Sequence, residues 1–154
     1  MDLIAHVIYG IIIFGLRPEV VLGSMIFDLA YIPACISIIS GKGLKHFSKL
    51  VKLGFRFHSI FTIPIPSLIA YLATHSTIAL RFMLSSTLHL IFDIPLHGVM
   101  GPYTLWPILD RRWPKGVTSW SKPNVIIGYY TILILIIIVK VIFGFGLLKP
   151  ICPI

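Results

Sequence analysis

The chain alternates between long apolar runs and short polar segments. Each run is almost continuously hydrophobic, with only isolated polar residues inside it. A membrane-spanning helix needs roughly 20 mainly apolar residues, whereas a surface helix of a soluble protein shows one apolar stripe. The pattern therefore predicts an all-α, multi-pass membrane bundle of about five helices. The five runs cover residues 3–16, 20–40, 60–73, 77–97 and 125–148.

The segments between the runs have the composition of turns and interfacial loops. Arg17-Pro18-Glu19 and Thr74-His75-Ser76 are predicted as tight turns, because proline suits a first helical position and charge is costly in lipid. Residues 42–56 are predicted as a basic loop. Residues 103–123 contain all three tryptophans, as expected for a loop at the membrane interface.

Composition supports a membrane protein and limits its size. The 154 residues are 57% hydrophobic and only 12% charged, with a mean hydropathy of +0.98, whereas soluble domains carry about 25% charge. We expect a single membrane domain over residues 1–154, with the polar motifs in 1–115 and a C-terminal anchoring helix at 125–148. The two cysteines, Cys35 and Cys152, follow no metal or redox spacing, and no disulfide is expected.

The distribution of charge predicts how the bundle is oriented. The net charge of +8 comes from 13 basic and five acidic residues. Nine of the 13 lie in residues 42–56 and 103–123, which flank a predicted two-helix hairpin and so share one side of the membrane. By the positive-inside rule this side is cytoplasmic, which places the N-terminus in the cytoplasm. The expected partners are membrane lipids with anionic headgroups, and no nucleic acid.

The first apolar run lacks the basic start and the small-residue cleavage site of a secretory signal, and we expect it to be retained. No internal repeat of the kind that many transporters show is present in the sequence.

Ionisable residues inside the apolar runs are the candidates for a functional site. His89, Asp93 and His97 are spaced by four residues, which places their side chains above one another on one helical face. Such groups are costly in hydrocarbon unless they pair, bind a metal or line a wet cavity. In the predicted topology, further ionisable groups fall at a similar depth in the cytoplasmic half of other helices. They are His6, Asp28 and His58.

This convergence predicts a single site that holds a divalent metal through His6, Asp28, His58, His89 and Asp93. Zinc favours nitrogen and oxygen ligands of this type, and the two carboxylates leave manganese as an alternative. The structural alternative is a set of His–Asp hydrogen bonds that only tie helices together.

The remaining polar residues are predicted either to surround the metal ligands or to play no part in the site. His97 follows Pro95, which disturbs the helix, and is either a ligand or an outer-shell or substrate contact. Asp2 either orients His6 or is an exposed N-terminal acid. Arg56, two residues before His58, either holds an anionic group, because guanidinium binds phosphate in a bidentate way, or is one more charge of the positive-inside pattern. His46 and His75 are expected to be solvated and dispensable.

These residues together resemble a known family, the membrane-bound metal-dependent hydrolases, also described as LexA-binding inner-membrane hydrolases (YdjM-like). The similarity covers about residues 1–115 and leaves the last helix outside. Phe57 stands where threonine is usual in that family, and the motif around Asp28 has one carboxylate fewer. The matching segments are His6, Gly23 to Asp28, Arg56-Phe57-His58-Ser59, His89 to Asp93, Leu105-Trp106-Pro107 and Asp110-Arg111-Arg112.

This resemblance implies that the protein is a membrane-bound, metal-dependent hydrolase of the inner membrane. The metal would activate a water, with His89 and Asp93 at the catalytic centre, and the basic surroundings favour a phosphoester or lipid-derived substrate at the cytoplasmic face. Two other functions remain open. One is a small ion or proton transporter that uses the His/Asp cluster as a relay, and the other is a non-catalytic membrane assembly protein.

Overall fold

The computed structural model describes residues 3–29, 32, 36, 39–40, 48–96, 103–111, 117–118 and 122–143. Within these residues the fold is all-helical, with six helices and no strand, as predicted for the fold class. The helices are α1 (Leu3–Phe14), α2 (Pro18–Leu29), α4 (Ser48–Phe57), α5 (Pro64–Thr74), α6 (Thr77–Leu96) and α7 (Pro123–Ile142).

The helix boundaries follow the local sequence signals. Pro18, Pro64 and Pro123 each occupy the first position of their helix, where a missing N–H costs nothing. His75 ends α5 in the left-handed conformation, with φ of 51°, and its N–H donates to the Tyr71 carbonyl. The predicted turns at 17–19 and 74–76 are therefore helix boundaries, although α2 already begins at Pro18.

The predicted loop at residues 42–56 is wrong from Ser48 onward, because α4 occupies Ser48–Phe57. Lys49, Lys52 and Arg56 recur at helical spacing, and so do Leu50, Leu53 and Phe57. An amphipathic helix accounts for both periods. A cluster of basic residues is also typical of a loop at the cytoplasmic side of a membrane, and this composition conceals the helical period.

Two helices, α6 and α7, are long and apolar enough to cross a membrane, with 20 residues each. Twenty residues span about 30 Å, the thickness of the hydrocarbon core. The shorter apolar helices α1 and α5 have 12 and 11 residues. The five-span count and the cytoplasmic N-terminus therefore remain predictions.

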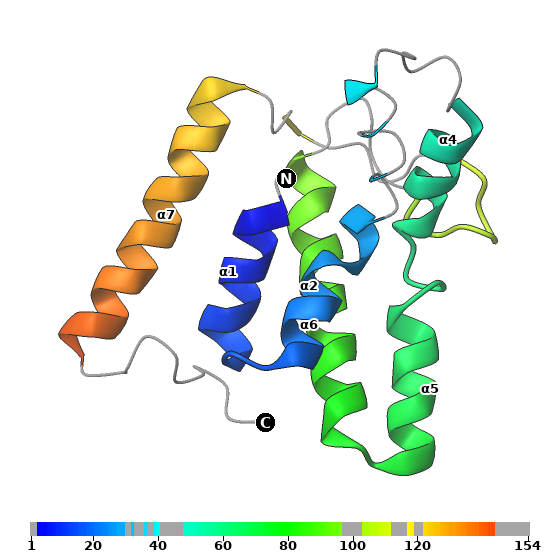
Figure 1. Ribbon diagram of the computed structural model, residues 1–154, viewed down its shortest axis with the longest axis horizontal. Helices are drawn as coiled ribbons and strands as arrows, with labels where there is room; N and C mark the ends of the chain where they lie inside the picture. The colour runs from blue at the N-terminus through cyan, green and yellow to red at the C-terminus, as the bar shows by residue number, and fades with distance from the viewer. Residues whose placement is uncertain are drawn as a thin grey trace.

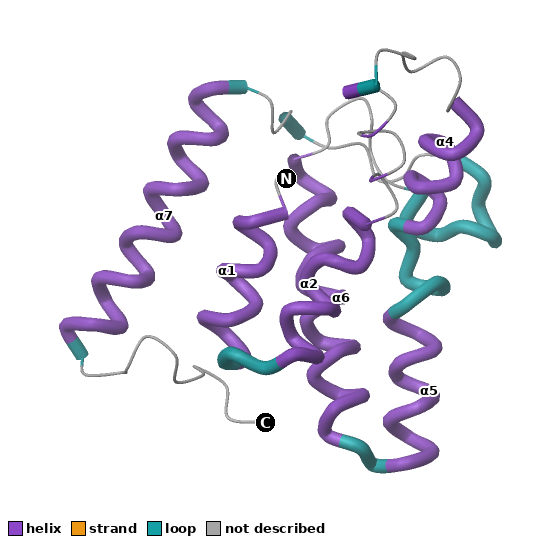
Figure 2. Tube along the Cα trace, viewed as in Figure 1, coloured by secondary structure: helices purple, strands orange, loops and turns teal. Residues whose placement is uncertain are grey.

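Helix α6 is the central element of the bundle. It packs against α2 and α5 over long stretches, and α1 lies against α2 (Figure 1). The direction of the chain alternates from α1 to α2 and from α5 to α6, so the start of α1, the end of α2 and the end of α6 lie at one end of the bundle (Figure 2). At the opposite end, Arg81 Nη1 donates to Glu19 Oε1 at 3.1 Å and joins the start of α6 to the start of α2.

Small residues allow α1, α2 and α6 to approach closely. A Cβ on Gly23 of α2 would collide with Ser85 Oγ and lie 2.7 Å from the Phe82 carbonyl oxygen of α6. A Cβ on Gly10 of α1 would collide with Ser24 Oγ of α2. Ser24 and Ser85 are fully buried at these crossings. Close approach through small residues is typical of helix pairs in membranes, where van der Waals packing replaces the hydrophobic effect.

Helix α7 is peripheral and packs on α1. Tyr9, Ile12 and Leu133 form a small buried cluster between the two helices. Lys140 is also buried there, and its Nζ donates a hydrogen bond to the Ile12 carbonyl at 3.1 Å. Because Ile12 lies in the last turn of α1, the ammonium satisfies a carbonyl that has no partner within the helix and stands at its negative end.

Replacing this lysine with methionine should weaken the attachment of α7. Hydrogen bonds to charged groups contribute about 1.5–3 kcal/mol, so we expect Lys140→Met to lower the thermal unfolding midpoint of the detergent-solubilised protein. Val139→Met, at a neighbouring exposed position, is the matched control and should leave the midpoint unchanged. Equal midpoints for the two variants would show that the Lys140 bond does not stabilise the fold.

Candidate metal centre

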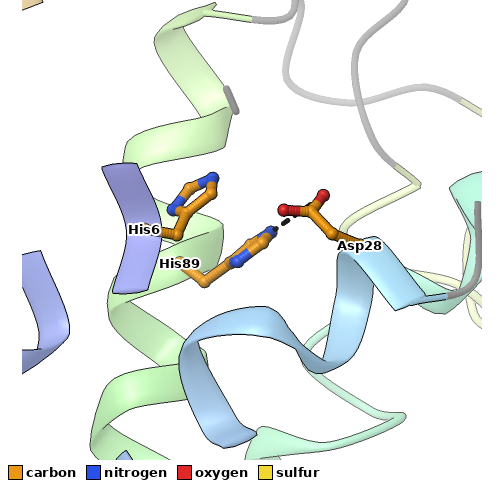
Figure 3. Close-up of side chains that lie close together, drawn as sticks. All are labelled: His6, Asp28 and His89. Carbon is orange, nitrogen blue, oxygen red and sulfur yellow. Dashed lines mark ion pairs between the residues drawn. The ribbon is translucent and has the colours of Figure 1, made fainter. Parts of the chain in front are cut away.

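Five ionisable side chains from four parts of the chain meet at one end of the bundle. His6 comes from α1, Asp28 from α2, His58 from the segment between α4 and α5, and His89 and Asp93 from α6. His6, His58, His89 and Asp93 are at most 2% exposed. The Asp28 side chain is 17% exposed and is the most open of the five. Figure 3 shows His6, Asp28 and His89 directed toward one another.

Asp93 lies at the centre of the cluster. Its Oδ1 accepts a hydrogen bond from His6 Nε2 at 3.0 Å. Its Oδ2 lies 3.1 Å from His89 Nε2, one helical turn earlier, and 3.5 Å from His58 Nε2. The i, i+4 spacing on α6 thus brings His89 and Asp93 together as the helical period requires. One carboxylate contacts three imidazoles.

Backbone carbonyls fix the orientation of two of these imidazoles. His89 Nδ1 donates to the Ser24 carbonyl at 2.6 Å, and His58 Nδ1 donates to the Gly54 carbonyl at 3.0 Å. A carbonyl only accepts, so both Nδ1 atoms carry the proton. In the neutral form of each ring, Nε2 then has a lone pair that faces carboxylate oxygens. This is how metal-ligating histidines are commonly held, with the second nitrogen bonded to a carbonyl or carboxylate.

A lone pair that faces a carboxylate oxygen is repulsive unless a positive charge lies between them. That charge is either a proton on Nε2 or a bound cation. The His6 and His89 rings stack with centroids 3.6 Å apart and planes at 15°. Two imidazolium ions at this separation would repel by roughly 5 kcal/mol at an effective dielectric constant near 20. The stacking therefore disfavours protonation of both rings at once.

Two overlapping groups of residues could hold a metal ion. One is His58, His89 and Asp93, all buried, and the other is His6, Asp28 and His89, with the ligand atoms of each group within 4.8 Å of one another. Tetrahedral zinc with ligands at about 2.1 Å separates its ligand atoms by about 3.4 Å. The distances of 3.1 Å and 3.5 Å from Asp93 Oδ2 to His89 and His58 lie on either side of that value.

Asp28 lies on the solvent-exposed side of the group formed by His58, His89 and Asp93. Its Oδ1 is 3.9 Å from both His58 Nε2 and His89 Nε2. Its Oδ2 has no hydrogen-bond partner among the described residues, and neither has His6 Nδ1. Buried polar atoms are normally satisfied, so these two atoms are available to a ligand.

The residues assigned outer roles have different positions. Arg56 donates from Nε to Asp110 Oδ1 at 3.0 Å and from Nη2 to Asp110 Oδ2. Its guanidinium is thus engaged by a carboxylate in the bidentate way in which a phosphate would be bound. His75 is exposed, far from the cluster in the α5–α6 turn. The predictions for Asp2, His97 and His46 fall outside the described residues.

Several supporting residues were not found from the sequence. The carbonyls of Ser24 and Gly54 orient His89 and His58, and no side-chain pattern reveals a backbone acceptor. The single Ser59 hydroxyl proton is shared between the carbonyls of Thr104 and Trp106, which holds residues 103–106 beside His58. The sequence signal for this contact was only the small polar Ser59 following His58.

Comparison with known proteins identifies no family: no family model, no curated protein and no solved structure matches the chain. The resemblance to membrane-bound metal-dependent hydrolases therefore remains a prediction from the motifs.

Proposed function

We propose that this protein is a multi-pass inner-membrane hydrolase that binds one divalent metal ion. The proposed ion is zinc, and its proposed ligands are His58, His89, Asp93 and Asp28. The observation that supports this most directly is the pair of hydrogen bonds from His58 Nδ1 and His89 Nδ1 to backbone carbonyls. They direct both Nε2 atoms at the Asp93 carboxylate. A divalent ion would also balance the charge of the two carboxylates.

The remaining residues have separate roles in this proposal. His6, hydrogen-bonded to Asp93 Oδ1, orients the carboxylate so that Oδ2 faces His58 and His89. Asp28 contributes Oδ1 on the open side and keeps Oδ2 to accept a proton from the attacking water. A bound metal would supply polarisation of the scissile bond and of that water.

A phosphoester, lipid-derived or otherwise, is the proposed substrate class. The support is electrostatic, because the cluster lies at the end of the bundle where α4 carries Lys49, Lys52 and Arg56. Arg56 is paired with Asp110, so a substrate phosphate would share or displace that carboxylate.

The test is metal content followed by activity. Protein purified in detergent with zinc or manganese present should retain about one equivalent of metal through gel filtration, and should hydrolyse a chromogenic phosphoester only when metal is retained. Metal loading should decline on acidification, because protons compete for the imidazole nitrogens. Full occupancy without hydrolysis of any phosphoester would reject the substrate class, and absence of metal would reject the mechanism.

A proton relay is the second candidate, favoured by the continuous contact from His6 through Asp93 to His89. Proteoliposomes with an internal pH dye separate the two functions. Proton flux that persists in metal-free protein would support the relay over hydrolysis.

A further inference from the structure

Helix α4 has three distinct faces. Gly54 is buried, and His58, one turn later, is buried too, so this face packs inward. Leu53 and Phe57 are exposed, with 48% and 39% of their surface accessible, although both are large and apolar. The third face, by helical register, carries Lys49, Lys52 and Arg56. An exposed apolar face beside a basic face is typical of helices that lie in a membrane interface.

The C-terminal end of α4 contacts both the His/Asp cluster and residues 103–110. Gly54 offers the carbonyl that holds His58 Nδ1. The Phe55 carbonyl accepts from Tyr103 N at 3.3 Å, and Ile60 N donates to the Thr104 carbonyl at 3.1 Å. Arg56 binds Asp110. These contacts link the position of α4 to that of the His58 ring.

We infer that α4 is an interfacial helix that binds the anionic surface of a lipid bilayer, and that this binding holds His58 in its position in the cluster. Leu53 and Phe57 insert among the acyl chains near the headgroups. Lys49 and Lys52 supply the positive charge that attracts lipid phosphates, while Arg56 remains bound to Asp110. Charge complementarity selects an anionic bilayer as the partner, since each basic residue near such a surface contributes about 1 kcal/mol. The inference deepens the proposed function, because it names the regulation of the same site.

The first experiment measures where α4 lies. Leu53→Cys, in a chain with Cys35→Ser and Cys152→Ser, is labelled with bimane and placed in nanodiscs of phosphatidylcholine, with or without phosphatidylglycerol. We expect quenching by nitroxide lipids to increase in the anionic discs. Lys49→Gln and Lys52→Gln should each reduce the membrane-bound population about fivefold, the equivalent of about 1 kcal/mol. Leu72→Cys, exposed on α5, is the control position and should respond equally in both lipids.

The second experiment measures the effect on His58. Hydrogen exchange of the amides at residues 58–62 and 103–106 should be slower in anionic than in neutral discs, while residues 71–76 are unchanged. The double variant Lys49→Gln/Lys52→Gln should abolish this difference, and Lys122→Gln, a basic residue outside α4, should retain it.

Both experiments are done with EDTA present, so neither depends on whether the site binds metal or hydrolyses a substrate. Position 53 quenched equally in both lipids would overturn lipid binding by α4. Equal exchange at residues 58–62 in both lipids would overturn the link to His58. A protein without metal that passes both experiments would retain this inference and lose the proposed function.

Discussion

Asp93→Asn should remove metal binding almost completely. Asparagine keeps the size of the side chain but loses the charge that faces His58 and His89 and that accepts from His6. Loss of an outer-shell partner costs 10–100-fold in metal affinity, and we expect the loss of this central carboxylate to exceed about 100-fold. Elemental analysis and zinc titration of the detergent-purified variant would measure it.

The control for this variant is His75→Asn, which changes an exposed histidine outside the cluster. It should bind metal as the wild type does. Circular dichroism should show that Asp93→Asn is still helical, because a variant that fails to fold loses metal for another reason. A helical Asp93→Asn protein with wild-type metal content would contradict the proposed site.

Gly23→Ala should separate α2 from α6 and disturb the site without altering any ionisable residue. The added Cβ meets the Phe82 carbonyl oxygen at 2.7 Å, and a backbone atom cannot rotate away. Overpacking of this kind costs about 1–3 kcal/mol. Because the next residue, Ser24, holds His89 through its carbonyl, metal affinity should fall together with the unfolding midpoint.

Gly128→Ala is the matched control, since a Cβ at Gly128 in α7 meets nothing within 4 Å. Alanine is the better helix former by about 1 kcal/mol, so this variant should be as stable as the wild type or more so. Gly10→Ala is predicted to be milder than Gly23→Ala, because its nearest contact is the Ser24 hydroxyl, which can rotate. A Gly23→Ala protein as stable as Gly128→Ala would disprove the role of close packing.

The sequence predicted helices where α1, α2, α5, α6 and α7 lie, because uninterrupted apolar runs and proline positions are local signals. It did not predict α4, whose helical period was concealed by its basic residues. The sequence also did not predict where α5 begins, since an apolar run does not specify the residue at which a helix starts inside it. The apolar run from Ile60, for example, forms a turn until Pro64.

The residues of the cluster could be predicted from the sequence, because an ionisable side chain inside an apolar run costs free energy unless it pairs, binds a metal or lines a wet cavity. His6, Asp28, His58, His89 and Asp93 were all identified in this way, and the structure places them together. Their roles were not predictable, since the central position of Asp93 depends on how helices far apart in sequence cross. The bond between Arg56 and Asp110 joins residues 54 positions apart and has no local signal.

The contact between His6 and Asp93 joins residues 87 positions apart, and this has a consequence for biogenesis. During synthesis α1, α2 and α5 emerge before the carboxylate that unites their polar groups. Until α6 follows, His6, Asp28 and His58 have no common partner, and α1 lacks its contact with the central helix. The site is therefore assembled late, and a metal that stabilises it would act on a bundle whose helices have already packed together.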